Sequence, residues 1–185
     1  PIIYPRWYSD IFCFIFERLI RVCIPLLLLS ELISLRPCFT SVRFILFLLD
    51  QNGVKRSNKG LKNPLVLFFY PKDDTPGCTI EVCGFRDKYD LFKVLGAQVW
   101  GVSNGSTSSH LAFANKNKLQ YPLLCDTNDS LRKTFKVPKV LGFMDGRVTY
   151  VIDRKGTVRH IFRDLLNGPE HIKEAIRVLK EIQNQ

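Results

Sequence analysis

Two cysteines, Cys78 and Cys83, stand five residues apart in the stretch of this sequence that is best placed to do chemistry. They follow an apolar run that ends at Tyr70 and a proline-rich turn that begins at Pro71. Cys78 falls at the start of a predicted helix, where roughly half a positive charge and unpaired N–H groups favour a thiolate over a thiol. Because the thiolate is the nucleophile, this position indicates a reactive cysteine. A buried, inert cysteine near a helix cap fits the same pattern.

An intact helix would keep the two thiols apart. Five residues along an ideal helix separate two Cα atoms by about 8.7 Å, whereas a disulfide normally needs about 4.4–6.8 Å. If the pair forms a disulfide, the first turns of the helix must unwind, which predicts two conformations of the site. Gly77 and Gly84 flank the cysteines and lower the resistance of the chain to unwinding.

The cysteine content argues against two other classes of protein. A secreted disulfide scaffold is usually shorter and denser in cysteine than this chain of 185 residues. A zinc site needs about four ligands, and the three histidines lie far from the close cysteine pair and from each other, so no metal is predicted. The chain has six cysteines: Cys13, Cys23, Cys38, Cys78, Cys83 and Cys125.

The formal net charge of +10 raises the possibility of nucleic-acid binding. However, the basic residues are scattered among acidic ones, so no nucleic-acid partner is predicted. One dense basic stretch is interpreted as a solvated loop, with a docking patch for an acidic partner as the alternative. It comprises Lys55, Arg56, Lys59 and Lys62.

The segment 1–45 differs from the rest of the chain because it is rich in Ile, Leu and Phe. Charged residues such as Glu17, Arg21 and Glu31 interrupt every window of about 20 residues that could span a membrane. We interpret the segment as an interfacial or targeting remnant, or as sequence foreign to the mature protein, with a spanning helix as the alternative. The chain starts at Pro1, so its N-terminus gives no secure targeting signal.

Residues 46–185 are predicted to form one α/β domain. The run 65–70 is a buried central strand, and the helical spacing of 79–95 ends at Gly96. Strand 98–103, a helix from 106 to about 119, strand 123–125 and helix 129–136 follow. A hairpin over 148–162 and a helix starting near Pro169 complete the order. This order predicts a thioredoxin-like fold, with a central mixed sheet flanked by helices.

The residues around Cys78 resemble a known family. The pattern Pro71-x-x-x-Thr75-x-x-Cys78 is similar to the active-site signature of peroxiredoxins. The position of Cys83 and the run Cys-Gly-Phe-Arg-Asp that it begins resemble the peroxiredoxin Q / bacterioferritin comigratory protein group of plant and algal type. The resemblance extends from about residue 46 to 182.

This resemblance implies a thiol-dependent peroxidase that reduces hydrogen peroxide and organic hydroperoxides in antioxidant defence. Cys78 would be the peroxidatic residue that becomes a sulfenic acid, and Cys83 the resolving residue that condenses with it to a disulfide. Thioredoxin or a similar dithiol protein would reduce that disulfide. No metal, haem or flavin cofactor is implied, and the resemblance further implies a monomer located in the plastid.

The resemblance also implies roles for three neighbours of Cys78. Pro71 would shield the thiolate from water, and the Thr75 hydroxyl would hydrogen-bond the Cys78 sulfur or the peroxide. Arg147 would stabilise the thiolate and polarise the O–O bond, with an exposed strand arginine as the alternative interpretation.

Other residues of the motif are interpreted as structural. Arg86 is expected to pair with Glu81 or Asp90 and so hold the helix. Cys125 is interpreted as a core thiol, not as a resolving residue.

The chain departs from the family before the central strand. Phe44 stands where relatives have a proline-containing strand, and residues 54–63 are shorter and more polar, which predicts a frayed or missing N-terminal hairpin. Two other functions are weighed against the peroxidase. A protein disulfide oxidoreductase is disfavoured because C-x4-C replaces C-x-x-C. A non-enzymatic thiol module or holdase, tethered to a membrane through residues 1–45, is the second.

Overall fold

The computed structural model describes residues 46–140, 142 and 144–184. The apolar segment 1–45, with Phe44 and the first three cysteines, lies outside these residues. Among the helices that are described, none combines the length and the apolar character needed to cross a bilayer.

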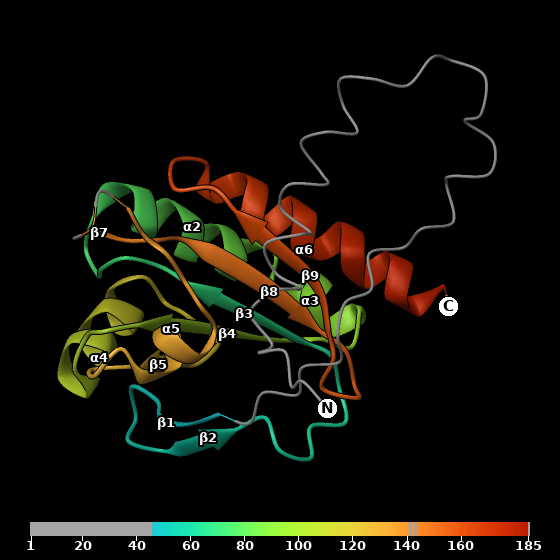
Figure 1. Ribbon diagram of the computed structural model, residues 1–185, viewed down its shortest axis with the longest axis horizontal. Helices are drawn as coiled ribbons and strands as arrows, with labels where there is room; N and C mark the ends of the chain where they lie inside the picture. The colour runs from blue at the N-terminus through green and yellow to red at the C-terminus, as the bar shows by residue number, and fades with distance from the viewer. Residues whose placement is uncertain (1–45, 141, 143, 185) are drawn as a thin grey trace, which may run out of the picture. The chain divides into compact units, whose positions relative to one another are not determined.

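A mixed five-stranded sheet organises the described residues (Figure 1). Its strand order is β5-β4-β3-β8-β9, in which β3, β4 and β5 are parallel, β8 runs antiparallel to them, and β9 pairs antiparallel with β8. Every residue of β3 is buried, as expected for a central strand. The strands are β3 (Leu65–Phe69), β4 (Gln98–Ser103), β5 (Leu123–Cys125), β8 (Val148–Ile152) and β9 (Val158–Arg163).

Helices and loops cover both faces of this sheet. Because successive side chains of a strand point to opposite faces, the residues of β3 contribute to two different cores. Val66 and Phe68 pack with apolar residues of α2, α3, α4 and α6. Leu65 and Leu67 pack on the other face with residues of α5 and with Leu46. The helices are α2 (Pro76–Asp87), α3 (Tyr89–Val94), α4 (Thr107–Lys116), α5 (Ser130–Thr134) and α6 (Gly168–Gln183).

The helix predicted over 79–95 begins earlier and is interrupted. Pro76 stands in the first turn of α2, where a missing N–H costs nothing, and Thr75 before it is extended. The backbone leaves the helix at Lys88 (φ −103°, ψ 8°), so the predicted single helix is in fact α2 and α3. The predicted end is confirmed, since Gly96 follows α3 with φ +64°.

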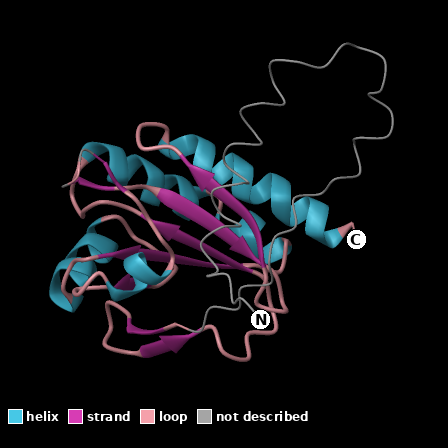
Figure 2. Cartoon of the chain, in the orientation of Figure 1, coloured by secondary structure: helices cyan, strands magenta, loops and turns pink. Residues whose placement is uncertain are grey.

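An N-terminal hairpin is present but short, so the alternative in which this hairpin is missing is wrong. Strand β1 (Phe47–Leu49) pairs antiparallel with β2 (Lys55–Ser57), separately from the central sheet (Figure 2). Buried Asp50 explains why so polar a hairpin holds: its carboxylate accepts hydrogen bonds from the backbone N–H groups of Asn52 and Val54 and from Arg56 Nε. A second hairpin, β6 (Lys139–Val140) with β7 (Met144–Asp145), was not predicted from the sequence.

Candidate active site

Cys78 lies in the first turn of α2, beyond the carboxyl end of β3, where α/β sheets bind ligands. Its side chain is only 2% exposed. Cys78, Cys83 and Cys125 are free thiols in this structure, and the intact helix holds Cys78 and Cys83 apart. The site is therefore seen in its dithiol state.

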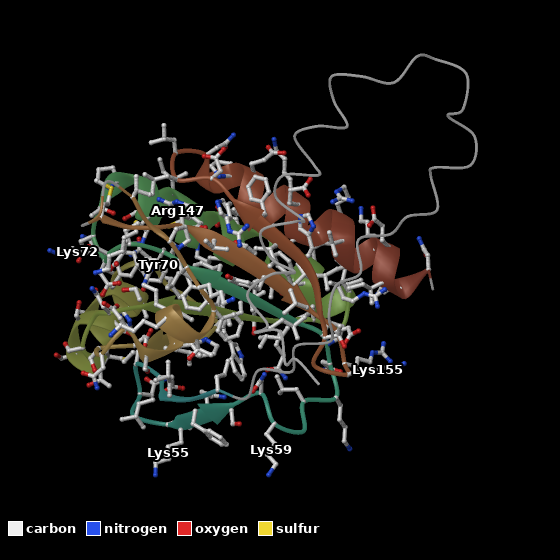
Figure 3. The ribbon with its side chains drawn as sticks, in the orientation of Figure 1. Lys55, Lys59, Tyr70, Lys72, Arg147 and Lys155 are labelled. Atoms are coloured by element: carbon white, nitrogen blue, oxygen red, sulfur yellow. The ribbon has the colours of Figure 1, made fainter. Side chains whose placement is uncertain are left out.

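Arg147, immediately before β8, lies beside Cys78. Its Nη2 is 3.7 Å from the Cys78 Sγ, and its Nη1 donates to a carboxylate oxygen of Glu81. Its Nε donates to the Leu165 carbonyl at 3.1 Å, so the guanidinium is held from three sides. Because Arg147 is 5% exposed, the alternative of an exposed strand arginine is wrong. Figure 3 shows its side chain close to α2.

Glu81 is a site residue that the sequence analysis missed as such. It lies one turn after Cys78 on the same face of α2 and is fully buried. Burial raises the pKa of Glu81 to about 8, although the Arg147 guanidinium acts in the opposite direction. One carboxyl oxygen, Oε1, has no hydrogen-bond partner among the described residues. A protonated Glu81 leaves the charge of Arg147 free to act on the Cys78 sulfur.

His171 closes the other side of Glu81. Its Nε2 lies 2.8 Å from the Asp164 carbonyl and must donate to it, so in the neutral ring Nδ1 accepts from the Thr149 hydroxyl at 2.8 Å. Burial lowers the pKa of His171 to about 4. Nδ1 also lies 3.7 Å from Glu81 Oε1, and because it carries no proton in this tautomer it cannot stabilise a negative charge on that oxygen.

The loop that precedes Cys78 is fixed by a buried network around Asp73. Its carboxylate accepts hydrogen bonds from the Tyr70 hydroxyl (2.8 Å) and the Ser109 hydroxyl (2.7 Å), and it contacts His110 Nδ1 (2.7 Å). Burial alone would raise the pKa of Asp73, but these hydrogen bonds outweigh it and lower the pKa below its ordinary value. The Tyr70 hydroxyl therefore helps to fix the loop that precedes Cys78.

Arg132 connects this loop to Arg147. It is 2% exposed and donates to the carbonyls of Tyr70 and Gly146, each at 2.9 Å. These carbonyls belong to the residues immediately before Pro71 and Arg147. One buried side chain of α5 thus fixes two of the predicted site residues relative to each other, a role that the sequence analysis did not assign.

Thr75 and Pro71 border the site, and both are half-buried. The Thr75 hydroxyl donates to the Lys72 carbonyl at 3.2 Å. The expected hydrogen bond to the Cys78 sulfur is therefore not the one that this state of the protein shows. A change of the Thr75 rotamer would be needed to direct the hydroxyl toward the sulfur or a bound peroxide.

Cys83 faces away from this cluster. It is half-buried, and its Sγ lies 3.5 Å from Asn117 Oδ1 at the end of α4. Arg86, one turn further along α2, binds Asp87 and the Asn117 carbonyl. The expected pairing of Arg86 with Glu81 or Asp90 is wrong, since Glu81 binds Arg147 and Asp90 pairs with Lys93.

Cys125 and the basic stretch lie away from Cys78 in the sequence. Cys125 ends the buried strand β5, and burial raises its pKa to about 11, which confirms its position as a core thiol. In the basic stretch, Lys55 and Lys59 point outward from the hairpin and the following loop in Figure 3. Arg56 is paired with Asp50.

Comparison with known proteins identifies the family of the chain. Residues 42–161 match the model of the AhpC/TSA family. Peroxiredoxin Q of Arabidopsis thaliana, described as chloroplastic, is 47% identical over 133 residues, which cover 71% of this chain and 62% of that protein. The chloroplastic peroxiredoxin Q of Suaeda salsa is 43% identical over 151 residues, covering 80% and 67%. The matched region thus spans only about two thirds of these relatives.

Solved structures give the same assignment. Peroxidoxin BcpB of Mycobacterium tuberculosis has a TM-score of 0.70 at 33% identity and covers 75% of this chain and 94% of its own. Peroxiredoxin Q of Xanthomonas campestris has a TM-score of 0.68 at 31% identity, covering 74% and 90%. The predicted thioredoxin-like fold is confirmed, and the chain belongs to the AhpC/TSA family of peroxiredoxins, within the peroxiredoxin Q group.

Proposed function

We propose that this protein is a thiol peroxidase in which Cys78 is the nucleophile. The observation that carries the proposal is the position of the Cys78 sulfur, in the first turn of α2 and 3.7 Å from Arg147 Nη2. The helix N-terminus and the guanidinium both stabilise a thiolate. The same guanidinium can stabilise the negative charge that develops on the peroxide oxygens in the transition state.

The proposed reaction has three steps. The Cys78 thiolate attacks one peroxide oxygen, the O–O bond breaks, and the departing oxygen takes a proton as water or an alcohol, leaving a sulfenic acid. The Cys83 thiol then attacks the Cys78 sulfur, and the hydroxyl leaves as water as the disulfide forms. A dithiol protein such as thioredoxin returns both cysteines to thiols and is itself oxidised.

The surroundings of Cys78 support the first step in particular. Pro71 and the loop fixed by Asp73 limit the access of water to the sulfur, while Arg147 and Glu81 complete a buried polar wall. Thr75 can reach the reacting oxygens after a rotamer change. All of these roles use side chains alone, and none needs a metal or an organic cofactor.

Consumption of hydrogen peroxide with a thioredoxin regenerating system tests the proposal. We expect turnover in the wild type, none in Cys78→Ser, and a single turnover in Cys83→Ser. Replacing thioredoxin with dithiothreitol separates the peroxidase from its reductant, since turnover with dithiothreitol alone would point to a different dithiol partner. A folded wild type that consumes no peroxide with either reductant would contradict the proposal and favour a non-enzymatic thiol module or holdase.

We also propose a plastid location, since the relatives from Arabidopsis thaliana and Suaeda salsa are described as chloroplastic. Imaging of the full-length product tests this, and a signal outside plastids would contradict it. For the assembly we propose a monomer, which size-exclusion chromatography with light scattering tests. A stable dimer at micromolar concentration would overturn it.

A further inference from the structure

The end of α4 contacts the turn of α2 that carries Cys83. Asn117 follows the last helical residue of α4 and is 9% exposed. Its side-chain oxygen accepts from the Cys83 thiol at 3.5 Å, and its backbone carbonyl accepts from Arg86 Nη1 at 2.8 Å. Two bonds from one residue thus hold the same turn of α2.

The orientation of the Asn117 amide is fixed by its surroundings. Its Nδ2 donates to the Phe113 carbonyl at 2.9 Å, within α4 itself. Since an amide nitrogen can only donate, the amide oxygen must point toward α2 and can only accept there. The Cys83 thiol is the donor it meets.

A third contact comes from the residues that directly follow α4. The Tyr121 hydroxyl donates to the Val82 carbonyl at 2.7 Å, and both residues are buried. Residues 117–121 therefore hold three successive features of α2: the Val82 carbonyl, the Cys83 thiol and the Arg86 guanidinium.

These contacts exist only while α2 is folded. In an ideal helix the Cα atoms of Cys78 and Cys83 are about 8.7 Å apart, beyond the about 6.8 Å limit of disulfide geometry. Formation of the bond therefore requires the helix to unwind, and it consumes the S–H group of Cys83, so that Cys83 can no longer donate to Asn117. Each contact thus stabilises the conformation in which Cys78 meets peroxide and opposes the one in which Cys83 reaches it.

We propose that Asn117 is a positioning residue for Cys83, which holds the thiol toward α4 and thereby sets how fast the Cys78 sulfenic acid is resolved. The proposal rests on the peroxidase function proposed above. Two reactions compete for the sulfenic acid. Attack by the Cys83 thiol forms the S–S bond and releases water. Attack on a second hydroperoxide transfers an oxygen to the Cys78 sulfur, gives a sulfinic acid and releases water or an alcohol.

The expected effect is moderate, because a neutral hydrogen bond that is broken on unwinding shifts the equilibrium by about three- to ten-fold. Asn117→Ala should raise the rate of disulfide formation by this factor and leave the rate of Cys78 oxidation within about two-fold. The peroxide concentration that converts half of Cys78 to sulfinic acid should rise by the same factor. Asn115→Ala is the matched control, since this asparagine lies on the exposed side of the same helix.

Rapid quenching followed by mass spectrometry measures the three Cys78 products in a single turnover. Hydrogen exchange of the α2 amides in the reduced protein measures unwinding without any peroxide, and Asn117→Ala should lower their protection by the same factor. If Asn117→Ala does not fold, Asn117→Ser gives the same readings, because serine is too short to reach Cys83.

Unchanged or slower disulfide formation in folded Asn117→Ala, or an equal effect in Asn115→Ala, would overturn the proposal. Failure of the peroxidase function itself is distinguishable, since Cys78 of the wild type would then not be oxidised at all. Oxidation at the normal rate with an unchanged ratio of disulfide to sulfinic acid refutes only the role of Asn117.

Discussion

The two cysteines of α2 are held by opposite kinds of environment. Cys78 is 2% exposed and lies beside the buried guanidinium of Arg147, which in turn binds the buried carboxyl group of Glu81. Cys83 is half-buried and faces a neutral amide at 3.5 Å. In a buried site, preorganised charges act strongly on a developing charge because little solvent screens them. A neutral bond near the surface is easily exchanged for water.

The difference between these two environments matches the roles proposed for Cys78 and Cys83 in the reaction. Attack on a peroxide needs a thiolate held still in a fixed field, whereas resolution needs a thiol that can leave its place. Helix α2 can carry a fixed thiolate and a releasable thiol because its first turn packs against the buried Arg147 and its later turn contacts the end of α4. Rigidity and release are thus separated by little more than one helical turn.

The largest expected effect comes from removing the charge at the Cys78 end. Arg147→Gln should lower the rate constant of Cys78 oxidation by about 100- to 1,000-fold, because the thiolate and the transition state lose their nearest cation. Stopped-flow mixing with hydrogen peroxide measures it. Arg154→Gln, an exposed arginine in the turn after β8, is the control and should react normally. A loss below about three-fold in a folded Arg147→Gln would contradict the proposed role of this cation.

Glu81→Gln tests the buried cluster through its pH dependence. Since the pKa of Glu81 is raised from 4.5 to about 8, the folded state holds a proton that the unfolded state releases between these values. The free energy of unfolding of the wild type therefore falls as pH rises from 4.5 to 8. Glutamine does not titrate, so the variant should gain relative stability across this window, on the order of a few kcal/mol by pH 8.

His171 acts in the opposite direction, which makes the comparison sharper. Its pKa is lowered from 6.5 to about 4, so its contribution is complete above pH 6.5 and is lost as pH falls toward 4. In the wild type the two trends partly cancel between pH 4.5 and 6.5. In Glu81→Gln, urea unfolding at several pH values should therefore show the decrease in the free energy of unfolding that protonation of His171 causes at low pH. Parallel curves for wild type and variant would show that Glu81 is ionised in the folded state.

The loop before Cys78 offers two neighbouring aspartates with different burial. Asp73 is 8% exposed and holds Tyr70, Ser109 and His110, whereas exposed Asp74 pairs with Lys116 on the surface. Asp73→Asn should destabilise the fold by about 1–3 kcal/mol and slow Cys78 oxidation by roughly ten-fold, because Pro71 and Thr75 lose their support. Asp74→Asn should cost less than about 1 kcal/mol. Urea unfolding and stopped-flow kinetics measure both, and equal effects would refute the importance of the buried network.

The sequence predicted what depends on local pattern. The run 65–69 is a buried strand, strand 98–103 has its predicted bounds, and Cys78 lies in the first helical turn as expected. Gly96 ends its helix with a positive φ, because glycine tolerates that conformation. In each case the signal lies within a few residues of the feature.

What the sequence did not predict depends on partners distant in the chain. Glu81 binds Arg147, which is 66 residues away in the chain, and Arg132 binds the Tyr70 carbonyl, which is 62 residues away. The spacing of apolar residues indicates only local structure, so it does not predict contacts of this kind. The break at Lys88 was missed for a different reason. Apolar residues continue at helical spacing across it, so the pattern is the same for one helix or two.

The smallest effect is expected at Cys125, the one described cysteine outside α2. Burial raises its pKa to about 11, so near pH 8 it is almost entirely a thiol and a poor nucleophile. Cys125→Ala should change peroxide turnover by less than about two-fold. In the reduced native protein, a maleimide should label half-buried Cys83 well before Cys125, as peptide mass mapping can show. Rapid labelling of Cys125, or loss of resolution in Cys125→Ala, would mean that a third thiol takes part and that the contrast between the two ends of α2 is incomplete.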